Sequence, residues 1–349
     1  MIDCHVHLRD WKQAEKETIL HGASLATEAG FTALFDMPNT SPPLIDVATL
    51  KRRIEYGQVE VAKINSKNNK KFFYGVYGGL TSNKKQITEI IQYAQANFPN
   101  CVGVKMFAGH STGNLGLTTE KEQFAVYKIL AELNYRGVIA VHCEKESHIK
   151  NELFEASAPQ THSLARPAVA ETESIADQIH FVQKSGFKGH LHICHISTAL
   201  GIKLVNEAKK AGIKISCGAT AHHALLNEDA YKKHGICAKM NPPLRDKENQ
   251  KAVFSALLTG EIDCIESDHA PHTLAEKNKG FSGIPGFAGS LRLIKTLREH
   301  GAPLPILQKL CGTNANKIFG TNFEVRVPSN ETINTIFPKI KNSYQFNIF

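Results

Sequence analysis

Several apolar segments of this sequence end in histidine, lysine or aspartate, residue types whose placement suits metal chemistry. His5 and His7 alternate in IDCHVHLRD, and both imidazoles would leave a strand on the same face. Six more such residues end or directly follow later apolar runs: Lys105, His142, His195, Asp268, His269 and His272. A single buried histidine is more often a hydrogen-bonded core residue than a ligand. Many such residues at equivalent positions predict one shared metal site.

Other polar residues fit a structural role better than a ligand role. Asp3 is expected to support its strand or to orient a ligand histidine. The histidines expected to lie outside the metal site are His162, His190, His192, His222 and His223.

The elements that must position these residues alternate regularly. Apolar or β-branched runs predict eight strands, at 2–8, 31–37, 71–79, 101–108, 137–143, 189–197, 213–220 and 262–268. Apolar residues recurring at intervals of three and four predict helices between them, including 15–30, 44–56, 84–98, 120–134 and 199–212. This alternation favours a (β/α)8 TIM barrel, for which ~250 residues is typical.

The competing architecture is a doubly wound open sheet. That fold would place a Gly-rich phosphate loop after its first strand, and the sequence has none there. In a barrel the carboxyl ends of all strands surround one mouth, which carries the active site. The polar strand ends are therefore expected to converge there.

Composition restricts the class of protein. The chain has 349 residues, of which 42% are hydrophobic and 21% charged, and its formal charge is +8. Apolar runs stay shorter than the ~20 residues of a membrane span, and Met1 leads straight into a strand, so a cytoplasmic protein without a membrane partner is expected. The eight cysteines are scattered without a CxxC pair, as reduced core residues are. The basic stretch 63–71 lacks interleaved aromatic residues, so no nucleic-acid partner is expected.

Seven ordered segments resemble dihydroorotases of the amidohydrolase superfamily. They are DCHVHLR, GFTALFDMPNTSPP, GVKMFAGHSTGN, VHCE, HICHIST, KMNPPLR and SDHAPHT. HxH alone would be weak evidence, whereas seven motifs in this order and spacing are specific. The resemblance runs from Ile2 to about Gly320.

This resemblance implies an amidohydrolase barrel with a two-metal centre, usually of zinc. His5, His7 and Asp268 would hold one ion, and His142 and His195 the other. A carboxylated Lys105 and a hydroxide would bridge the two ions. The implied activity is reversible hydrolysis of the cyclic amide of dihydroorotate to N-carbamoyl-aspartate, in pyrimidine biosynthesis, with Asp268 as the catalytic proton shuttle.

The substrate would be held beside the metals. Arg9 leaves the first strand on the same side as the ligands, and a guanidinium can grip a carboxylate through two parallel hydrogen bonds. In the family, residues matching Arg9, Asn39 and His272 bind the substrate carboxylate. Residues matching Asn241, Pro285 and Gly286 contact the pyrimidine ring. Asn39 has a simpler interpretation as a turn residue in MPNTSPP.

Two kinds of protein compete with this assignment. Hydantoinases and allantoinases share the barrel and the chemistry, but their substrates lack the carboxylate that HLR and MPNT would bind. An inactive homologue could serve as a scaffold for a carbamoyltransferase, but such a chain would be expected to have lost ligands, and every motif position here is chemically competent.

The predicted domain organisation differs from that of the longer family members. It is predicted to consist of a barrel over 1–320 and an extension over 321–349 that packs on the barrel, too short for their accessory β-sandwich. Its motifs SDHAPHT and NPPLR nevertheless look like those of the longer members, so a homodimer and a monomer are both open alternatives. Some longer members bridge the metals with an aspartate. The assignment of Lys105 as the bridging ligand therefore depends on the motif KMF at the end of its predicted strand.

The Gly-rich segment at 111–116 is a candidate loop closing over substrate.

Overall fold

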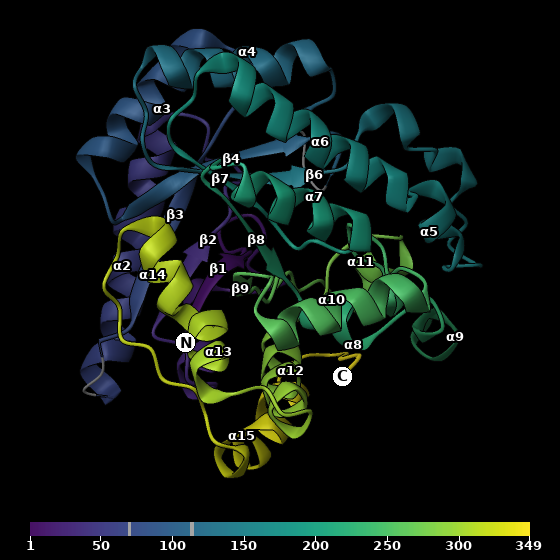
Figure 1. Ribbon diagram of the computed structural model, residues 1–349. Coiled ribbons are helices and arrows are strands. Elements are labelled where there is room, and N and C mark those ends of the chain that lie inside the picture. The colour runs from purple at the N-terminus through teal and green to yellow at the C-terminus, as the bar shows by residue number, and fades with distance from the viewer. Residues whose placement is uncertain (69–70, 112–114) are drawn as a thin grey trace.

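A computed structural model describes residues 1–68, 71–111 and 115–349. Eight parallel strands form a barrel with helices around it (Figure 1). In order around the sheet they are β1 (Ile2–Val6), β2 (Ala33–Asp36), β3 (Phe73–Gly79), β4 (Cys101–Ala108), β6 (Val138–Cys143), β7 (His190–Ile193), β8 (Ile215–Ala219) and β9 (Cys264–Ile265). A two-residue strand, β5 (Gly116–Leu117), pairs with the end of β4. The predicted TIM barrel is confirmed.

The helices that cover the barrel begin at sequence signals for helix starts. Thr18, Asn83, Thr119 and Thr198 each accept a backbone N–H of the first turn, and Thr119 forms a capping box with Glu122. The longer helices are α1 (Ile19–Glu28), α2 (Val47–Asn68), α3 (Lys84–Ala96), α4 (Glu120–Glu132), α6 (Ala168–Ser185), α7 (Ala199–Lys210), α10 (Lys247–Thr259), α12 (Phe287–Glu299) and α15 (Asn330–Asn342). The shorter ones are α5 (Thr161–Ala165), α8 (Ala221–Leu225), α9 (Ala230–His234), α11 (Leu274–Asn278), α13 (Leu304–Gln308) and α14 (Asn314–Phe319).

The last strand is much shorter than the predicted 262–268. After β9 the chain turns, and Asp268 has a φ of 43°, in the left-handed region that cannot continue a strand. The barrel closes through contacts beyond the strand itself. The His7 N–H donates to the His269 carbonyl at 2.7 Å, and the Ser267 N–H donates to Asp3 Oδ1 at 3.1 Å. These bonds join the first and last strands of the barrel.

Apolar side chains fill the barrel interior on the side away from the predicted mouth. Phe35 and Tyr77 pack there edge-to-face on Phe319, which comes from α14. Seven of the eight cysteines are buried, and all eight are free thiols. The interior is therefore a packed core and not a channel, as usual for small barrels.

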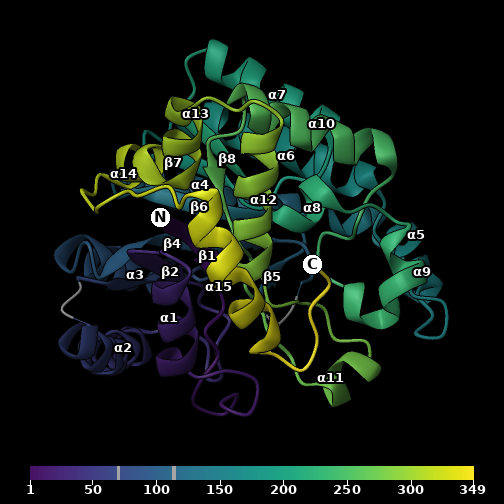
Figure 2. The ribbon, with the colours of Figure 1, turned by 90° about the horizontal axis from the view of Figure 1, so that it is seen from below.

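Residues after 320 contact the barrel at several places. Figure 2 shows α15 lying beside α12, and the following segment brings Tyr344 back toward the first and last strands. The Tyr344 hydroxyl donates to Glu17 Oε2 at 2.6 Å and lies 3.0 Å from His269 Nε2. The His269 ring stacks on Phe287 of α12, with ring centroids 3.8 Å apart.

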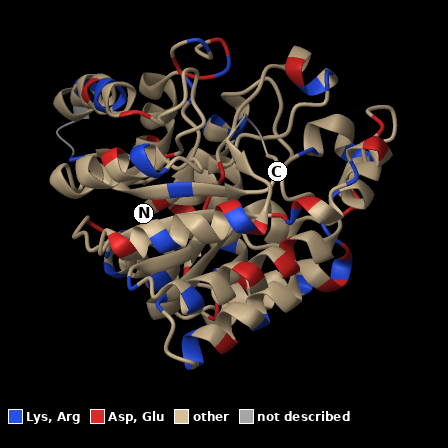
Figure 3. Ribbon diagram, turned by 90° about the horizontal axis from the view of Figure 1, so that it is seen from above, with Lys and Arg blue, Asp and Glu red and all other residues tan. Residues whose placement is uncertain are grey.

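Charged residues of both signs are interspersed along the outer helices (Figure 3). In the described part of the chain, none of the helices combines the length and apolar character that crossing a bilayer requires.

A buried ion pair anchors α2 to the end of β2. Arg53 NH2 donates to Asp36 Oδ2 at 2.6 Å, and the Tyr74 hydroxyl donates to the same oxygen at 2.6 Å. The other oxygen, Oδ1, accepts the Leu8 N–H at 3.0 Å. Because Leu8 stands between His7 and Arg9, this pair also fixes the backbone that presents those two side chains.

We expect Arg53→Met to lower the free energy of unfolding by about 3–5 kcal/mol, because it leaves the Asp36 carboxylate buried without its partner. Urea denaturation measures this change. Lys51→Ala on the same helix is the matched control, because Lys51 and Glu55 form a pair whose side chains are 61% and 62% exposed. That substitution should change stability by less than about 1 kcal/mol. Equal effects of the two substitutions would contradict an anchoring role for Arg53.

Candidate metal and substrate site

One group of potential ligands joins the first and last strands. The Nε2 atoms of His5 and His7 lie 3.4 and 3.1 Å from Asp268 Oδ1. The two imidazoles stand at the end of β1, and Asp268 follows β9. All three side chains are buried, and their ligand atoms lie close enough together to bind one metal ion. A buried triad of two imidazoles and a carboxylate matches the ligand types of zinc.

A second group lies at the ends of β6 and β7. His142 Nδ1 and His195 Nε2 face each other at 3.1 Å. The opposite nitrogen, His142 Nε2, lies 2.9 Å from Glu144 Oε2, which also accepts from Arg166 NH2 at 2.6 Å. Burial alone would raise the pKa of Glu144, but Arg166 and His142 hold that pKa well below its usual range.

The partners of His142 determine which of its nitrogens can bind a metal. Because Glu144 is ionised, it accepts the Nε2 proton, and the neutral ring is left with a lone pair on Nδ1 that points toward His195. Two nitrogens bound to one zinc at ~2.0–2.1 Å lie about 3.3 Å apart, close to the observed separation. The pair therefore has the chemistry and the spacing of two ligands of one ion.

The two groups adjoin, and the rings of His5, His142 and His195 are held in the neutral form. The His195 ring centroid lies 5.0 Å from that of His5 and 4.9 Å from that of His142. Burial is the largest cause that lowers the pKa of each of these three rings. Neutral imidazole is the form that binds metal, so the donor set fits a pair of zinc ions.

Lys105, the predicted bridging ligand, lies in surroundings that are unusual for a lysine. Its side chain is fully buried on β4, and its Nζ donates to Cys194 Sγ at 3.0 Å. Among the described residues, it forms no ion pair with a carboxylate. A buried lysine normally has an anionic partner, so the surroundings of Lys105 are unusual for this residue type.

The predicted substrate residues border the same cavity. Its described lining comprises His5, His7, Arg9, Asn39, Phe107, Ser111, His142, His195, Asn241, Asp268, Ala270, Ser282 and Gly283. Arg9 Nε donates to the Pro271 carbonyl at 3.2 Å, which directs the guanidinium into this space. Burial lowers the pKa of Arg9 to about 10, which leaves it a cation at neutral pH.

Asn39 and Asn241 have defined partners at the cavity. Asn39 Oδ1 lies 2.7 Å from His7 Nδ1, so Asn39 contacts a candidate ligand and does more than form a turn. Asn241 Oδ1 accepts from the Ser282 hydroxyl at 3.1 Å and lies 2.9 Å from His162 Nε2. His162, expected to be structural, thus holds a predicted substrate residue.

The remaining predicted residues lie farther from the cavity surface. His272 Nε2 lies 3.2 Å from Arg9 NH2 without lining the described cavity. Pro285 and Gly286 are also outside its described lining, and the Gly286 N–H donates to His269 Nδ1 at 3.1 Å. The structure therefore does not bring these two residues to the cavity. Of the predicted loop at 111–116, Ser111 lines the cavity, and 112–114 lie outside the described residues.

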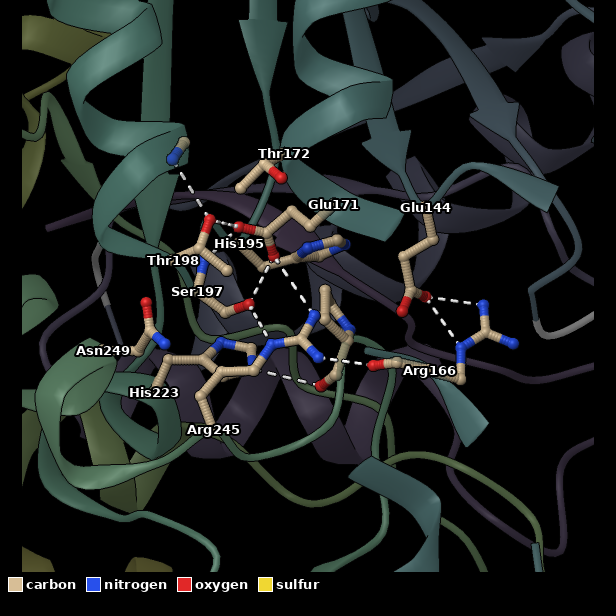
Figure 4. Close-up of polar contacts among 12 residues, drawn as sticks. Glu144, Arg166, Glu171, Thr172, His195, Ser197, Thr198, His223, Arg245 and Asn249 are labelled. Atoms are coloured by element: carbon tan, nitrogen blue, oxygen red, sulfur yellow. Dashed lines mark hydrogen bonds and ion pairs between the residues drawn. The ribbon is translucent and has the colours of Figure 1, made fainter. Parts of the chain in front are cut away.

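Sequence reasoning missed the charged residues that support the ligands. Figure 4 shows two of these groups, Glu144 with Arg166 and Glu171 with the segment after His195. Glu171 accepts from the Thr198 hydroxyl at 2.6 Å, and also from the Ser197 hydroxyl, which in turn accepts from Arg245 Nε at 3.0 Å. Glu144 and Arg245 end the motifs VHCE and NPPLR, so a signal was present. Nothing in the local pattern marked Glu171.

Comparisons with known proteins place the chain among cyclic amidases. It is 32% identical over 331 residues to a dihydroorotase of Methanosphaera stadtmanae, covering 91% of this chain and 70% of that protein. It is 33% identical over 305 residues to a dihydroorotase of Lactobacillus acidophilus, covering 85% and 66%. The chain thus spans about two thirds of the length of these curated relatives. No protein-family profile matches it.

Solved structures share the fold at lower sequence identity. An L-hydantoinase from Arthrobacter aurescens superposes with a TM-score of 0.79 at 22% identity, over 91% of this chain and 70% of that one. A dihydroorotase from Campylobacter jejuni gives a TM-score of 0.69 at 18% identity, over 93% and 84%. At these identities the likeness supports the barrel architecture alone.

The neutral histidines predict a pH dependence of stability. The pKa values of His5, His142 and His195 are lowered in the folded chain, so these rings stay neutral while the unfolded chain takes up protons below about pH 6.5. The free energy of unfolding of the metal-free protein should therefore fall from pH 7 to pH 5, by up to about 1.4 kcal/mol per pH unit for each ring.

Urea denaturation in the presence of a chelator measures this dependence. Other buried histidines add to the slope, so the contribution of one ring is isolated with His195→Gln. The free energy of unfolding of this variant should depend less steeply on pH, because the unfolded variant takes up about one proton fewer than the unfolded wild type. If its slope equals that of the wild type, His195 is not held neutral by the fold.

Proposed function

Because the chain belongs to the dihydroorotase family, as its curated relatives show, we propose that it catalyses the reversible hydrolysis of (S)-dihydroorotate to N-carbamoyl-L-aspartate in pyrimidine biosynthesis. The observation that carries this proposal is a single buried cavity shared by two groups of metal-ligand side chains and the Arg9 guanidinium. The two groups of ligand side chains suit metal-assisted hydrolysis of an amide, and the Arg9 guanidinium suits a substrate with a carboxylate.

The cofactor that fits these residues is a pair of zinc ions. His5, His7 and Asp268 would hold one ion, His142 and His195 the other, and a carboxylated Lys105 would contribute to both. When bound, zinc lowers the pKa of water toward neutrality and polarises carbonyl oxygens. The carboxylation is supported by the buried position of Lys105, which has no carboxylate partner among the described residues.

Asp268 is the residue placed to move the proton. Water adds to the ring carbonyl carbon, the C–N bond breaks, and the ring nitrogen gains a hydrogen. Asp268 would accept the proton from the attacking water and return it to the leaving nitrogen. Its carboxylate lines the cavity, and Oδ1 faces His5 and His7.

Arg9 accounts for the choice of substrate. Its guanidinium is buried and cationic, and its Nε is already held by the Pro271 carbonyl. A planar guanidinium in this position binds a carboxylate strongly, because water is excluded and the side chain is already oriented. Asn39 and His272 would assist it, and Asn241 would contact the ring. Ring contacts from Pro285 and Gly286 have no support from the geometry of the cavity.

Three properties stay predictions from the sequence alone. They are the cytoplasmic location, the expectation that neither a nucleic acid nor a membrane is a partner, and the formation of a homodimer. The small-molecule substrate is the one partner that the comparisons support.

The purified zinc-loaded protein should hydrolyse dihydroorotate in preference to hydantoin and allantoin. Arg9→Met should lower kcat/KM for dihydroorotate by about 30-fold or more, the loss expected when a buried carboxylate partner is removed at about 2–5 kcal/mol. Its zinc content should stay unchanged, because Arg9 is not a ligand. Initial rates with each substrate, together with metal analysis, give these quantities.

Arg52→Met is the matched control, because Arg52 is an exposed arginine that lies over Trp11, with its guanidinium carbon 4.6 Å from the ring centroid. It should retain wild-type kinetics. Turnover of hydantoin without turnover of dihydroorotate would overturn the proposed function.

Lys105→Ala should lose at least one of the two metal ions and most of the activity, because an alanine cannot form a carbamate bridge. Acetate or propionate should restore part of both by filling the vacated space with a carboxylate. Metal content after dialysis and the rate with added acid measure the two effects.

Lys145→Ala controls for the loss of a lysine. Lys145 pairs with Glu120 at 2.7 Å and Asp177 at 2.8 Å and does not line the described cavity, so this variant should keep both ions. Full metal occupancy and activity in Lys105→Ala would show that Lys105 is not the bridge.

A further inference from the structure

Glu266 is a fully buried carboxylate with contacts to the histidines on both sides of the candidate metal centre. It follows β9, two residues before Asp268, and its side chain is 0% exposed. Oε2 accepts the His195 backbone N–H at 2.8 Å, and Oε1 lies 2.7 Å from His192 Nε2. A polar group at this depth requires hydrogen-bond partners, and those of Glu266 include the backbone of a candidate ligand.

Glu266 also faces the outer nitrogen of His5. His5 Nδ1 is buried, has no hydrogen-bond partner among the residues that the structure describes, and lies 3.9 Å from Glu266 Oε2. The other nitrogen, Nε2, faces Asp268. A carboxylate near Nδ1 favours the tautomer that carries its proton there, and this tautomer leaves the Nε2 lone pair free for a metal. The carboxylate thus orients a ligand in the first group.

The contact with His195 acts on the second group. His195 has a φ of 37°, in the left-handed region that a residue with a side chain rarely adopts. This backbone conformation is unfavourable on its own, and the ring of the residue that adopts it faces His142. The hydrogen bond from its N–H to Glu266 stabilises the turn and fixes the direction in which the ring leaves the strand.

Hydrogen bonds from residues inside the barrel fix the position of the Glu266 side chain. His192 Nδ1 lies 2.7 Å from the Ser216 hydroxyl, which lies 2.8 Å from His190 Nε2, so the carboxylate ends a chain of hydrogen bonds through the barrel. Gly218 on β8 leaves the space that it occupies. A Cβ at residue 218 would lie 2.2 Å from Glu266 Cδ.

We propose that Glu266 is a positioning residue for both halves of the metal centre, because one buried carboxylate fixes the His5 tautomer and the His195 backbone together. The proposal rests on the metal-dependent function proposed above. It assigns to Glu266 a role that the seven sequence motifs did not include.

A third metal site is the alternative use of these atoms. His5, Cys194 and Glu266 do place three ligand atoms close together. However, Glu266 Oε2 already accepts from His195, and Cys194 Sγ already accepts from Lys105. The geometry therefore assigns Glu266 to support of the ligands.

The test measures metal binding directly. Metal-free wild type, Glu266→Gln and Gly218→Ala are titrated with zinc against a chromophoric chelator, and their cobalt-loaded forms are compared by visible absorption. Both variants should bind each of the two ions 10- to 100-fold more weakly and show an altered cobalt spectrum, because loss of a ligand's supporting partner has effects of this size. Gly218→Ala leaves the Glu266 side chain chemically unchanged but displaces it, so this variant tests the positioning role if Glu266→Gln does not fold.

Asp263→Asn is the matched control. Asp263 lies before the same strand and accepts the Cys217 N–H of β8 at 2.9 Å, but at the opposite end of the barrel. It should bind both ions as the wild type does. Wild-type affinity for either ion in folded Glu266→Gln or Gly218→Ala overturns the positioning role. Failure of the wild type itself to bind two ions would instead contradict the proposed metal-dependent function.

Discussion

The mouth of this barrel depends on keeping several imidazoles neutral and oriented where water is scarce. A buried neutral histidine needs an acceptor for one nitrogen and a donor or metal for the other. Glu144 supplies the acceptor for His142, and Arg166 keeps Glu144 ionised. The nitrogens that remain face one another or face Asp268. A cation is the one partner that suits all of these lone pairs at once, so the supporting carboxylates and the metal preference have the same physical origin.

The scaffold brings these side chains together by leaving regular strand geometry at the points of use. His195, Asp268 and Arg9 all have left-handed backbone conformations. Such residues are held in place only when the surrounding structure supplies compensating contacts. For His195 the contact comes from Glu266, and for Arg9 it comes from the Pro271 carbonyl. Strain at the strand ends is thus distributed over a rigid barrel, and each functional group is presented at a different angle from its strand.

Much of this arrangement could be predicted from the sequence. Apolar runs alternating with amphipathic segments predicted the barrel, and the polar residues at the ends of those runs predicted which end of the barrel carries the site. The last strand was predicted too long, because periodicity does not reveal a left-handed turn such as that at Asp268. Glu171 and Glu266 were missed for another reason: a buried charge has the same local pattern as an exposed one until its partner, here Arg245 or His192, is known. Pro285 and Gly286 came from resemblance alone, and the ligand assignments stay predictions.

Because the first and last strands close the barrel, the two groups of candidate ligands are completed at different stages of protein synthesis. His142 and His195 are separated by 53 residues, and both precede β8. His7 and Asp268 are 261 residues apart. Domains can begin to fold during synthesis from the N-terminus, but a contact cannot form before both residues have emerged from the ribosome. The group containing His5 and His7 therefore remains incomplete until Asp268 has been made, so an ion that needs all three side chains can bind only after β9, the last strand of the barrel, has emerged.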